Sequence, residues 1–315
     1  MSEPAGMSTA PTVERLVLVG VGLIGGSLAR ALRASGWAGS IEGAVRTHAE
    51  LDEALALGVL DAGSTDPESV CPGADVVVLA TDLAAMPALL PRIGACLAPH
   101  AVLTDVGSVK SAVVGMARAS LGEQFPRFVP GHPIAGTERS GVAASFERLF
   151  FERRCVLTPL KETAPEAIER VTDMWQAAGA TVHQMTPDAH DETFALTSHL
   201  PHLIAYSMVA QLADADAKAR AGASDTGGHV PGPLDFAAGG FADITRIAQS
   251  RADLWVDILD RNRDAVLTHG RRFTHDMTRL LDALERGDLS LLATEFSRAV
   301  ETRRTLERAR PDSPT

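Results

Sequence analysis

The sequence has few cysteines, and their spacing excludes two kinds of stabilising site. Cys71, Cys96 and Cys155 are its three cysteines, and no two of them form a CxxC pair. Isolated thiols of this kind predict neither a disulfide framework nor a cysteine-ligated zinc ion, and they are typical of a cytoplasmic protein. We therefore expect a cytoplasmic chain without disulfides and without a bound metal.

Long apolar runs and an excess of positive charge are also missing. No segment approaches the roughly 20 apolar residues of a membrane-spanning helix, and residues 1–12 lack the basic and apolar parts of a signal peptide. The net charge is −11, which disfavours nucleic acid and anionic membranes as partners. We expect residues 1–12 to be a flexible tail and the ligands to be small molecules.

The composition that remains is that of a folded protein. Hydrophobic residues make up 45% of the sequence and charged residues 22%, which is ordinary for globular proteins. The length of 315 residues is sufficient for two domains. In the first half, segments of helical periodicity alternate with short apolar runs that predict strands over residues 15–20, 40–45, 74–81 and 101–108. This alternation predicts an α/β domain with a doubly wound parallel sheet of Rossmann type. The runs at 154–159 and 180–185 are expected to extend that sheet.

Strand-like runs disappear in the second half of the sequence. Amphipathic segments there predict long helices over residues 191–213, 252–287 and 288–309. Residues 213–246 are rich in Gly, Asp and Pro, and they predict a long loop that covers another part of the molecule. We expect a Rossmann-type domain over residues 13–185 and an all-helical domain over residues 186–310.

A glycine pattern at the first predicted strand indicates the ligand of the first domain. Gly20, Gly22 and Gly25 form G-x-G-x-x-G between this strand and a helix that starts with Leu23 and Ile24. The glycines permit a tight turn, close approach of a pyrophosphate and close helix packing, while the helix N-terminus favours the anion. The sequence therefore predicts a dinucleotide-binding domain.

The end of the second predicted strand bears on the choice between NAD and NADP. An NAD-selective site usually has an acidic residue there, but this sequence has Val45, followed by Arg46 and Thr47. Arg46 suits the extra phosphate of NADP, although an exposed arginine at a helix start has the same appearance. We expect NAD or NADP as the cofactor, with acceptance of NADP slightly favoured.

Two loops at the carboxyl ends of predicted strands carry candidate catalytic residues. Ser108 lies in "TDVGSVK" and His132 in "GHPIAGTERSG", and both loops leave strands at the edge where ligands of α/β sheets bind. A neutral histidine can remove the proton of a hydroxyl group while a hydride leaves, so His132 is the candidate base. The alternatives are a structural histidine and, for Ser108, an N-cap of the following helix.

The helical half adds further polar candidates. His199 and His202 lie three residues apart, on one face of a helix that Pro201 is expected to bend, and they suit an anion better than zinc. Asp243 and Arg246 follow a glycine pair, where the arginine can bind a carboxylate or simply form a surface ion pair. Trp255 is either part of this site or ordinary helix packing.

Five stretches together resemble the prephenate/arogenate dehydrogenase family of tyrosine biosynthesis. They are "GLIGGS", "DVGSVK", "GHPIAGTERSG", "SHLPH" and "GFADITRIA" with Trp255 after it, in the order of the family and over residues 15–309. The resemblance implies a Rossmann-type domain followed by a helical domain that forms a homodimer. It also implies oxidative decarboxylation, in which a hydride leaves C4 of a cyclohexadienol and the ring carboxylate leaves as carbon dioxide.

The same resemblance implies a role for each candidate residue. His132 matches the histidine that bonds the substrate 4-hydroxyl, and Ser108 the serine that orients this histidine and the nicotinamide. Arg246 matches the arginine that binds a substrate carboxylate, with Asp243 in the attached ionic network. The remaining pocket residues implied by the family are Thr137, Glu138, His199, His202 and, near the entrance, Trp255.

The sequence leaves several functions open. It does not separate prephenate from arogenate or from a 4-amino-4-deoxyprephenate-type substrate of secondary metabolism. A β-hydroxyacid dehydrogenase or imine reductase has a similar domain order, although Lys218 matches its usual lysine poorly. A dinucleotide-binding regulator without catalysis would need none of His132, His202 and Arg246.

Overall fold

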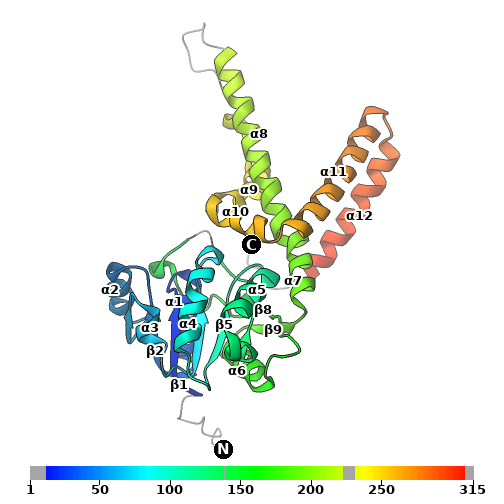
Figure 1. Cartoon of the computed structure of the whole chain (residues 1–315). Helices are drawn as coiled ribbons and strands as arrows, with labels where there is room; N and C mark the ends of the chain where they lie inside the picture. The colour runs from blue at the N-terminus through cyan, green and yellow to red at the C-terminus, as the bar shows by residue number, and fades with distance from the viewer. Residues whose placement is uncertain (1–11, 138, 223–230, 309–315) are drawn as a thin grey trace, which may run out of the picture. The chain divides into compact units, whose positions relative to one another are not determined.

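The computed structural model describes residues 12–137, 139–222 and 231–308. The chain forms two compact units, Met1–Arg263 and Asp264–Thr315 (Figure 1). Of the predicted tail over residues 1–12, all but Thr12 lies outside the described residues.

The first unit is built on a six-stranded parallel sheet with the order β3-β2-β1-β4-β5-β6. This is the strand order of the Rossmann dinucleotide-binding fold, so the predicted fold class is confirmed. The strands are β1 (Val13–Val19), β2 (Ala38–Ala44), β3 (Ala62–Ser64), β4 (Val76–Leu79), β5 (Val102–Asp105) and β6 (Phe128–Val129).

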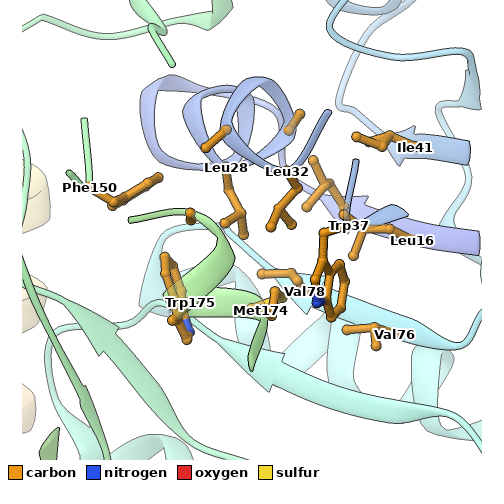
Figure 2. Close-up of a cluster of buried hydrophobic side chains, with 14 of the residues drawn as sticks. Leu16, Leu28, Leu32, Trp37, Ile41, Val76, Val78, Phe150, Met174 and Trp175 are labelled. Carbon is orange, nitrogen blue, oxygen red and sulfur yellow. The ribbon is translucent and has the colours of Figure 1, made fainter. Parts of the chain in front are cut away.

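Helices cover both faces of this sheet because its strands are apolar on both sides. Successive side chains of a strand point to opposite faces, so Leu16 and Leu18 join one core and Val17 and Val19 the other. The first core also contains side chains of α1 (Leu23–Ala34) and α6 (Pro165–Ala177), which meet β1 and β4 in Figure 2. The second contains those of α4 (Met86–Cys96) and α5 (Lys110–Ser120). Strands buried on both faces are typical of parallel sheets.

The expectation that residues 154–159 and 180–185 extend this sheet is wrong. They contain β8 (Arg154–Leu157) and β9 (Thr181–Gln184), which form a second, three-stranded sheet with β7 (Gly131–Pro133). β7 pairs antiparallel with β8, and β8 pairs parallel with β9. The chain changes sheets at Pro130, which has no N–H for the ladder and whose carbonyl accepts a hydrogen bond from Thr158 N at 2.9 Å.

The rest of the first unit is helical. Its remaining α-helices are α2 (His48–Ala56), α3 (Pro67–Val70), α7 (Pro187–Phe194), α8 (Leu200–Gly222), α9 (Gly239–Thr245) and α10 (Ala252–Arg261). Residues Ala195–His199 form a π-helical segment between α7 and α8, just before Pro201, where the sequence indicated a bend.

Two predicted boundaries in the helical half are wrong. α8 continues to Gly222, although residues 213–246 were expected to be a loop. Alanine has the highest helix propensity, and the polar side chains there stay on the surface or pair along the helix, as Arg220 does with Asp216 at 2.5 Å. The predicted helix over 252–287 is interrupted at Asn262, a buried residue between α10 and α11.

The second unit is a pair of helices, α11 (Arg263–Glu285) and α12 (Leu289–Arg308), joined through Gly287 at φ +68°. Arg279 and Glu295 link the two helices at 2.8 Å. No helix of the described ranges is long and apolar enough to cross a membrane. The helices nevertheless expose many large apolar side chains: Leu267, Phe273, Met277, Leu281, Leu284, Leu289, Phe296, Val300 and Leu306.

Candidate active site

The glycine loop after β1 is shaped for a ligand rather than for side chains. A Cβ on Gly20, whose φ is +95°, would lie 2.5 Å from the carbonyl oxygen of Ala80, and one on Gly25 would lie 2.2 Å from that of Gly20. Both positions are therefore restricted to glycine by contacts within the protein. A Cβ on Gly22 would instead meet no atom of the described structure within 4 Å.

The open position at Gly22 fits a pyrophosphate. Helix α1 begins at Leu23, and Gly22 supplies no side chain to cap it. The N–H groups of the first helical turn, including those of Leu23 and Ile24, have no partners within a helix, and the helix dipole favours an anion there. The loop thus has the free space, donors and electrostatics that a dinucleotide phosphate needs.

The end of β2 carries an ion pair that the sequence did not indicate. Val45 is buried, while the Arg46 guanidinium bonds Glu50 at 2.7 Å and the other Glu50 oxygen accepts the Arg46 backbone N–H at 3.0 Å. Thr47 is the N-cap of α2 and accepts the Glu50 N–H at 3.2 Å. Burial opposes ionisation of Glu50, but the bonds from Arg46 and Thr47 hold its pKa below the ordinary value. Glu50 therefore places a negative charge beside Arg46.

A buried ion pair fixes the start of β7, the strand that carries His132. Lys110 and Asp105 are both fully buried and bond each other, and Lys110 Nζ also donates to the Gly131 carbonyl at 2.6 Å. Asp105 in turn accepts the N–H groups of Gly131 at 3.1 Å and Gly107 at 2.7 Å. Burial lowers the pKa of Lys110, and Asp105 opposes this effect. The pair holds the residue before His132 against the carboxyl end of β5.

His132 lies on β7 and is partly buried, and its hydrogen-bond partner is another histidine. Its Nδ1 is 2.8 Å from Nε2 of His190 on α7, and Nδ1 of His190 is 2.8 Å from Oδ1 of Asp191. The Phe194 ring packs against both imidazoles, with centroid distances of 5.0 and 4.4 Å. Within the described ranges the Ser108 hydroxyl does not bond His132, so His190 holds the ring.

Asp191 also caps the helix that follows Ser108. Its carboxylate accepts the N–H groups of Lys110 at 2.7 Å and Ser111 at 2.8 Å, at the first turn of α5. The alternative role of Ser108 as an N-cap is wrong, because the N-cap of α5 is Val109, which makes no side-chain cap. Burial raises the pKa of Asp191, but its hydrogen bonds outweigh burial and leave the pKa below the ordinary value. Asp191 is therefore a carboxylate that only accepts hydrogen bonds.

The two histidines of the "SHLPH" segment have different environments. His199 is buried, and the Asn262 amide donates to its Nδ1 at 3.0 Å and to the Asp191 carbonyl at 2.8 Å. His202 donates through Nδ1 to the Ser198 carbonyl at 2.9 Å and stacks on Trp255, with centroids 3.4 Å apart. Neutral His199 therefore carries its proton on Nε2, whereas neutral His202 has an accepting Nε2.

The histidines of the site favour their neutral forms. Burial and the charges of His190, Lys110 and His199 lower the pKa of His132 well below its usual value. Burial also lowers the pKa of His190, partly offset by Asp191, and that of His199 to about 4. Burial and then the positive charge of Arg246 lower the pKa of His202, although its bond to Ser198 opposes them. A neutral histidine can act as a base near neutral pH.

Other candidate site residues lie at the surface. Arg246 begins a short 3₁₀ segment (Arg246–Gln249), and Asp243 lies on α9. Both are exposed, and neither forms an ion pair with any residue that the structure describes, so the ionic network implied by the resemblance stays a prediction. Thr137 is exposed and accepts the Arg139 N–H at 3.2 Å, whereas Glu138 lies outside the described residues. Among the described side chains, no group of three or more His, Cys, Asp or Glu could hold a metal ion.

Three residues of this site were not predicted from the sequence: His190, Asp191 and Asn262. The signal is present only in part, because "HDE" at residues 190–192 shows polar side chains but not which element they face. His132 and His190 are 58 residues apart, and only the folded chain brings them together.

The phosphate loop at the carboxyl edge of a Rossmann sheet, with a neutral histidine held at the same edge, is typical of NAD(P)-dependent oxidoreductases. The chain belongs to one family within this class, that of the prephenate dehydrogenases. Residues 28–184 match the family model "Prephenate dehydrogenase, nucleotide-binding domain", and residues 186–298 match "Prephenate dehydrogenase, dimerization domain".

The similarity to individual relatives covers most of the chain. The cyclohexadienyl dehydrogenase of Zymomonas mobilis is 31% identical over 93% of this chain and 96% of its own length. The prephenate dehydrogenase of Bacillus subtilis is 33% identical over 92% of this chain and 75% of its own. The crystal structure of Aquifex aeolicus prephenate dehydrogenase with hydroxyphenyl propionate and NAD+ is 32% identical, covers 93% of this chain and 97% of its own, and has a TM-score of 0.82.

Proposed function

We propose that this protein oxidatively decarboxylates prephenate to 4-hydroxyphenylpyruvate, or arogenate to tyrosine, with NAD or NADP as the hydride acceptor. The observation that carries the proposal is the position of His132, neutral and held by His190, at the sheet edge that also bears the phosphate loop. The names of the relatives, which include prephenate and cyclohexadienyl dehydrogenases, favour this reaction over a β-hydroxyacid dehydrogenase or a regulator without catalysis.

The chain's own task in this reaction is to hold and return one proton. When bound at the glycine loop, the nicotinamide cofactor would supply the acceptor for the hydride that leaves C4 of the substrate ring. His132 accepts the 4-hydroxyl proton as C4 becomes a carbonyl carbon. Loss of the ring carboxylate as carbon dioxide then makes the ring aromatic, and His132 returns the proton to the phenolate oxygen. Substrate and oxidised cofactor thus give phenol, carbon dioxide and reduced cofactor with no net release of a proton.

The other candidate residues serve to bind and orient in this proposal. Arg246 supplies a positive charge for a substrate carboxylate, and the segment Arg246–Gln249 contacts α8, the helix that carries His202. Nε2–H of His199 is a donor and Nε2 of His202 an acceptor for polar groups of the substrate. The remaining proposed pocket residues are Ser108, Thr137, Glu138, Asp243 and Trp255.

The cofactor site is proposed from the glycine loop and the end of β2. Gly20, Gly22 and Gly25 shape the loop, and the N–H groups of Leu23 and Ile24 bind the pyrophosphate. Arg46 and Thr47 face the adenosine ribose, where the missing acid at Val45 supports acceptance of NADP.

We also propose a homodimer in which the chain divides at about residue 185. The last strand ends at Gln184, and the two matched family models meet between residues 184 and 186. The second model is described as a dimerization domain. The exposed apolar side chains of α11 and α12 support a partner surface in this part of the chain.

The test is an assay of the full chain with prephenate and with arogenate, each with NAD and with NADP, followed by absorbance of the reduced cofactor. We expect turnover in at least one combination. His132→Asn should lower kcat by at least about 10² because it removes the base, while the dinucleotide Kd changes little. Turnover of this variant at the wild-type rate would remove His132 from the role, and four inactive combinations with bound cofactor would reject the substrates.

A further inference from the structure

We infer that His190 and Asp191 are positioning residues that hold the proton of His132 on Nδ1 and leave its Nε2 as the proton acceptor for the substrate. The inference deepens the proposed function, because it rests on His132 being the base of that reaction. Neither residue was a candidate for this role in the sequence.

The order of donors and acceptors in the series His132–His190–Asp191 follows from the carboxylate of Asp191. Asp191 already accepts the backbone N–H groups of Lys110 and Ser111, and a carboxylate can only accept. Nδ1 of His190, at 2.8 Å from Asp191 Oδ1, must therefore donate. A neutral imidazole has a single N–H, so Nε2 of His190 accepts. The proton between the two rings then belongs to Nδ1 of His132, at 2.8 Å.

The opposite arrangement would need a cationic His190. In that case Nε2 of His190 would donate, and His132 would carry its own proton on Nε2, where it could not accept the substrate proton. The charged groups that act on the two rings are Asp105, Lys110 and Asp191, together with His199. Burial of His190 and the nearby charge of Lys110 both disfavour the cation, although Asp191 and Asp105 favour it.

The pair is anchored firmly enough to impose this orientation. His190 is fully buried, and Asp191 is almost fully buried. The carboxylate of Asp191 is bound to the first turn of α5, and its carbonyl accepts the amide of Asn262 at 2.8 Å. Rotation of the His190 ring would break two hydrogen bonds and rotation of the Asp191 carboxylate three, and losing buried hydrogen bonds is costly.

The orientation matters because the proposed reaction uses the same nitrogen twice. Nε2 of His132 must take the hydroxyl proton and later return it to the phenol oxygen. While the proton is held, His132 is a cation, and the hydrogen bond to His190 connects it to the negative charge of Asp191. No proton has to reach Asp191 for this stabilisation.

A purely structural role is the alternative. In that case the buried pair only fixes α7 against α5, and changing it would lower stability without altering the protonation of His132. Activity measurements must therefore be combined with a readout of the proton itself.

The first test compares three variants of the full chain. His190→Phe keeps a ring but removes both nitrogens, and we expect kcat to fall by about 10² or more while substrate KM and dinucleotide Kd change less than about threefold. His190→Gln places an amide oxygen near the position of Nε2, where it can accept from His132, and should keep kcat within about tenfold of wild type. His183→Gln alters an exposed histidine on β9 and serves as the matched control.

The second test measures the proton directly by nitrogen-detected NMR of histidine-labelled protein without ligands. We expect His132 to be protonated on Nδ1 in the wild type and in His190→Gln, and to gain the Nε2–H form in His190→Phe. A wild-type His132 protonated on Nε2 would overturn the inference, as would full kcat in His190→Phe. This measurement needs no substrate, so it tests the inference independently of the proposed reaction. Absence of turnover in the wild type would reject the reaction, while the NMR spectrum would still show which nitrogen of His132 carries the proton.

Discussion

At the scale of single residues, the carboxylate of Glu50 bears on the cofactor preference proposed for the end of β2. Glu50 bonds the guanidinium and the backbone N–H of Arg46. The side chain of Arg46 is 86% exposed, so the ion pair itself contributes little to stability. Its effect would be on ligands, because in the proposed cofactor site the negative charge of Glu50 would repel the 2′-phosphate of NADP.

This argument predicts a shift in cofactor preference. Glu50→Gln keeps the shape of the side chain and an oxygen for the Arg46 N–H, but it removes the charge. We expect the KM for NADP to fall about three- to tenfold relative to that for NAD, which corresponds to about 1 kcal/mol. Steady-state assays with both cofactors measure the ratio.

A neighbouring glutamate provides the control for this prediction. Glu53 lies on the same helix and is exposed, so Glu53→Gln removes the same charge about one turn away. It should leave the ratio nearly unchanged. An equal shift in both variants would show that overall charge, and not the contact with Arg46, sets the preference.

Residue types predicted His132 as the candidate base, but they did not predict the residue that holds its ring. A histidine between glycines at the edge of a parallel sheet pointed to His132. The chemistry of its neighbour could not be seen, because His190 lies 58 residues away and belongs to another helix. Sequence spacing reveals partners within one helix or strand, whereas a hydrogen bond between β7 and α7 depends on how the two elements pack.

At the scale of elements, the glycine loop between β1 and α1 has one glycine that matters for stability and another that matters for ligand binding. Gly25 is closely packed against the Gly20 carbonyl, while Gly22 faces open space. We expect Gly22→Ala to leave the free energy of unfolding within about 0.5 kcal/mol of wild type and to raise the dinucleotide Kd at least about tenfold. The added methyl group would occupy the space of the pyrophosphate.

Gly25→Ala should have a different effect. Its methyl group would overlap a backbone oxygen 2.2 Å away, so we expect a loss of roughly 1–3 kcal/mol in unfolding free energy. Denaturant titrations and fluorescence titrations with the reduced cofactor measure the two quantities. Normal cofactor affinity in Gly22→Ala would place the phosphates elsewhere.

Elements with a strong periodicity were predictable, and those defined by long-range pairing were not. The strands β1, β4 and β5 coincide with apolar runs, because strands buried on both faces are largely apolar. The strand β2 is less apolar and only partly buried, and the run at residues 40–45 did not predict its first two residues. The second sheet escaped prediction because β7 has three residues and pairs with β8 across a long connection. The predicted helix ended at residue 213, whereas α8 continues to Gly222, because the polar residues after 213 resemble those of a loop.

At the scale of the whole molecule, the exposed apolar residues of the second unit need a covering surface. Leu284 is 60% exposed and Phe296 58% exposed in the single chain. Clusters of such residues are unusual on a monomer and typical of association surfaces. In a twofold dimer each residue contributes at two places, so one substitution acts twice.

We therefore predict that the wild type has about twice the mass of one chain in light scattering, and that Leu284→Glu combined with Phe296→Glu yields a monomer. Full burial of each apolar side chain is worth about 1.5–3 kcal/mol, so the dimer Kd should rise by at least about 10². Leu57→Glu is the matched control, because Leu57 is an exposed apolar residue, 41% exposed, in the first unit. A monomeric wild type would contradict the predicted homodimer, whereas a double variant that remains dimeric would move the interface away from α11 and α12.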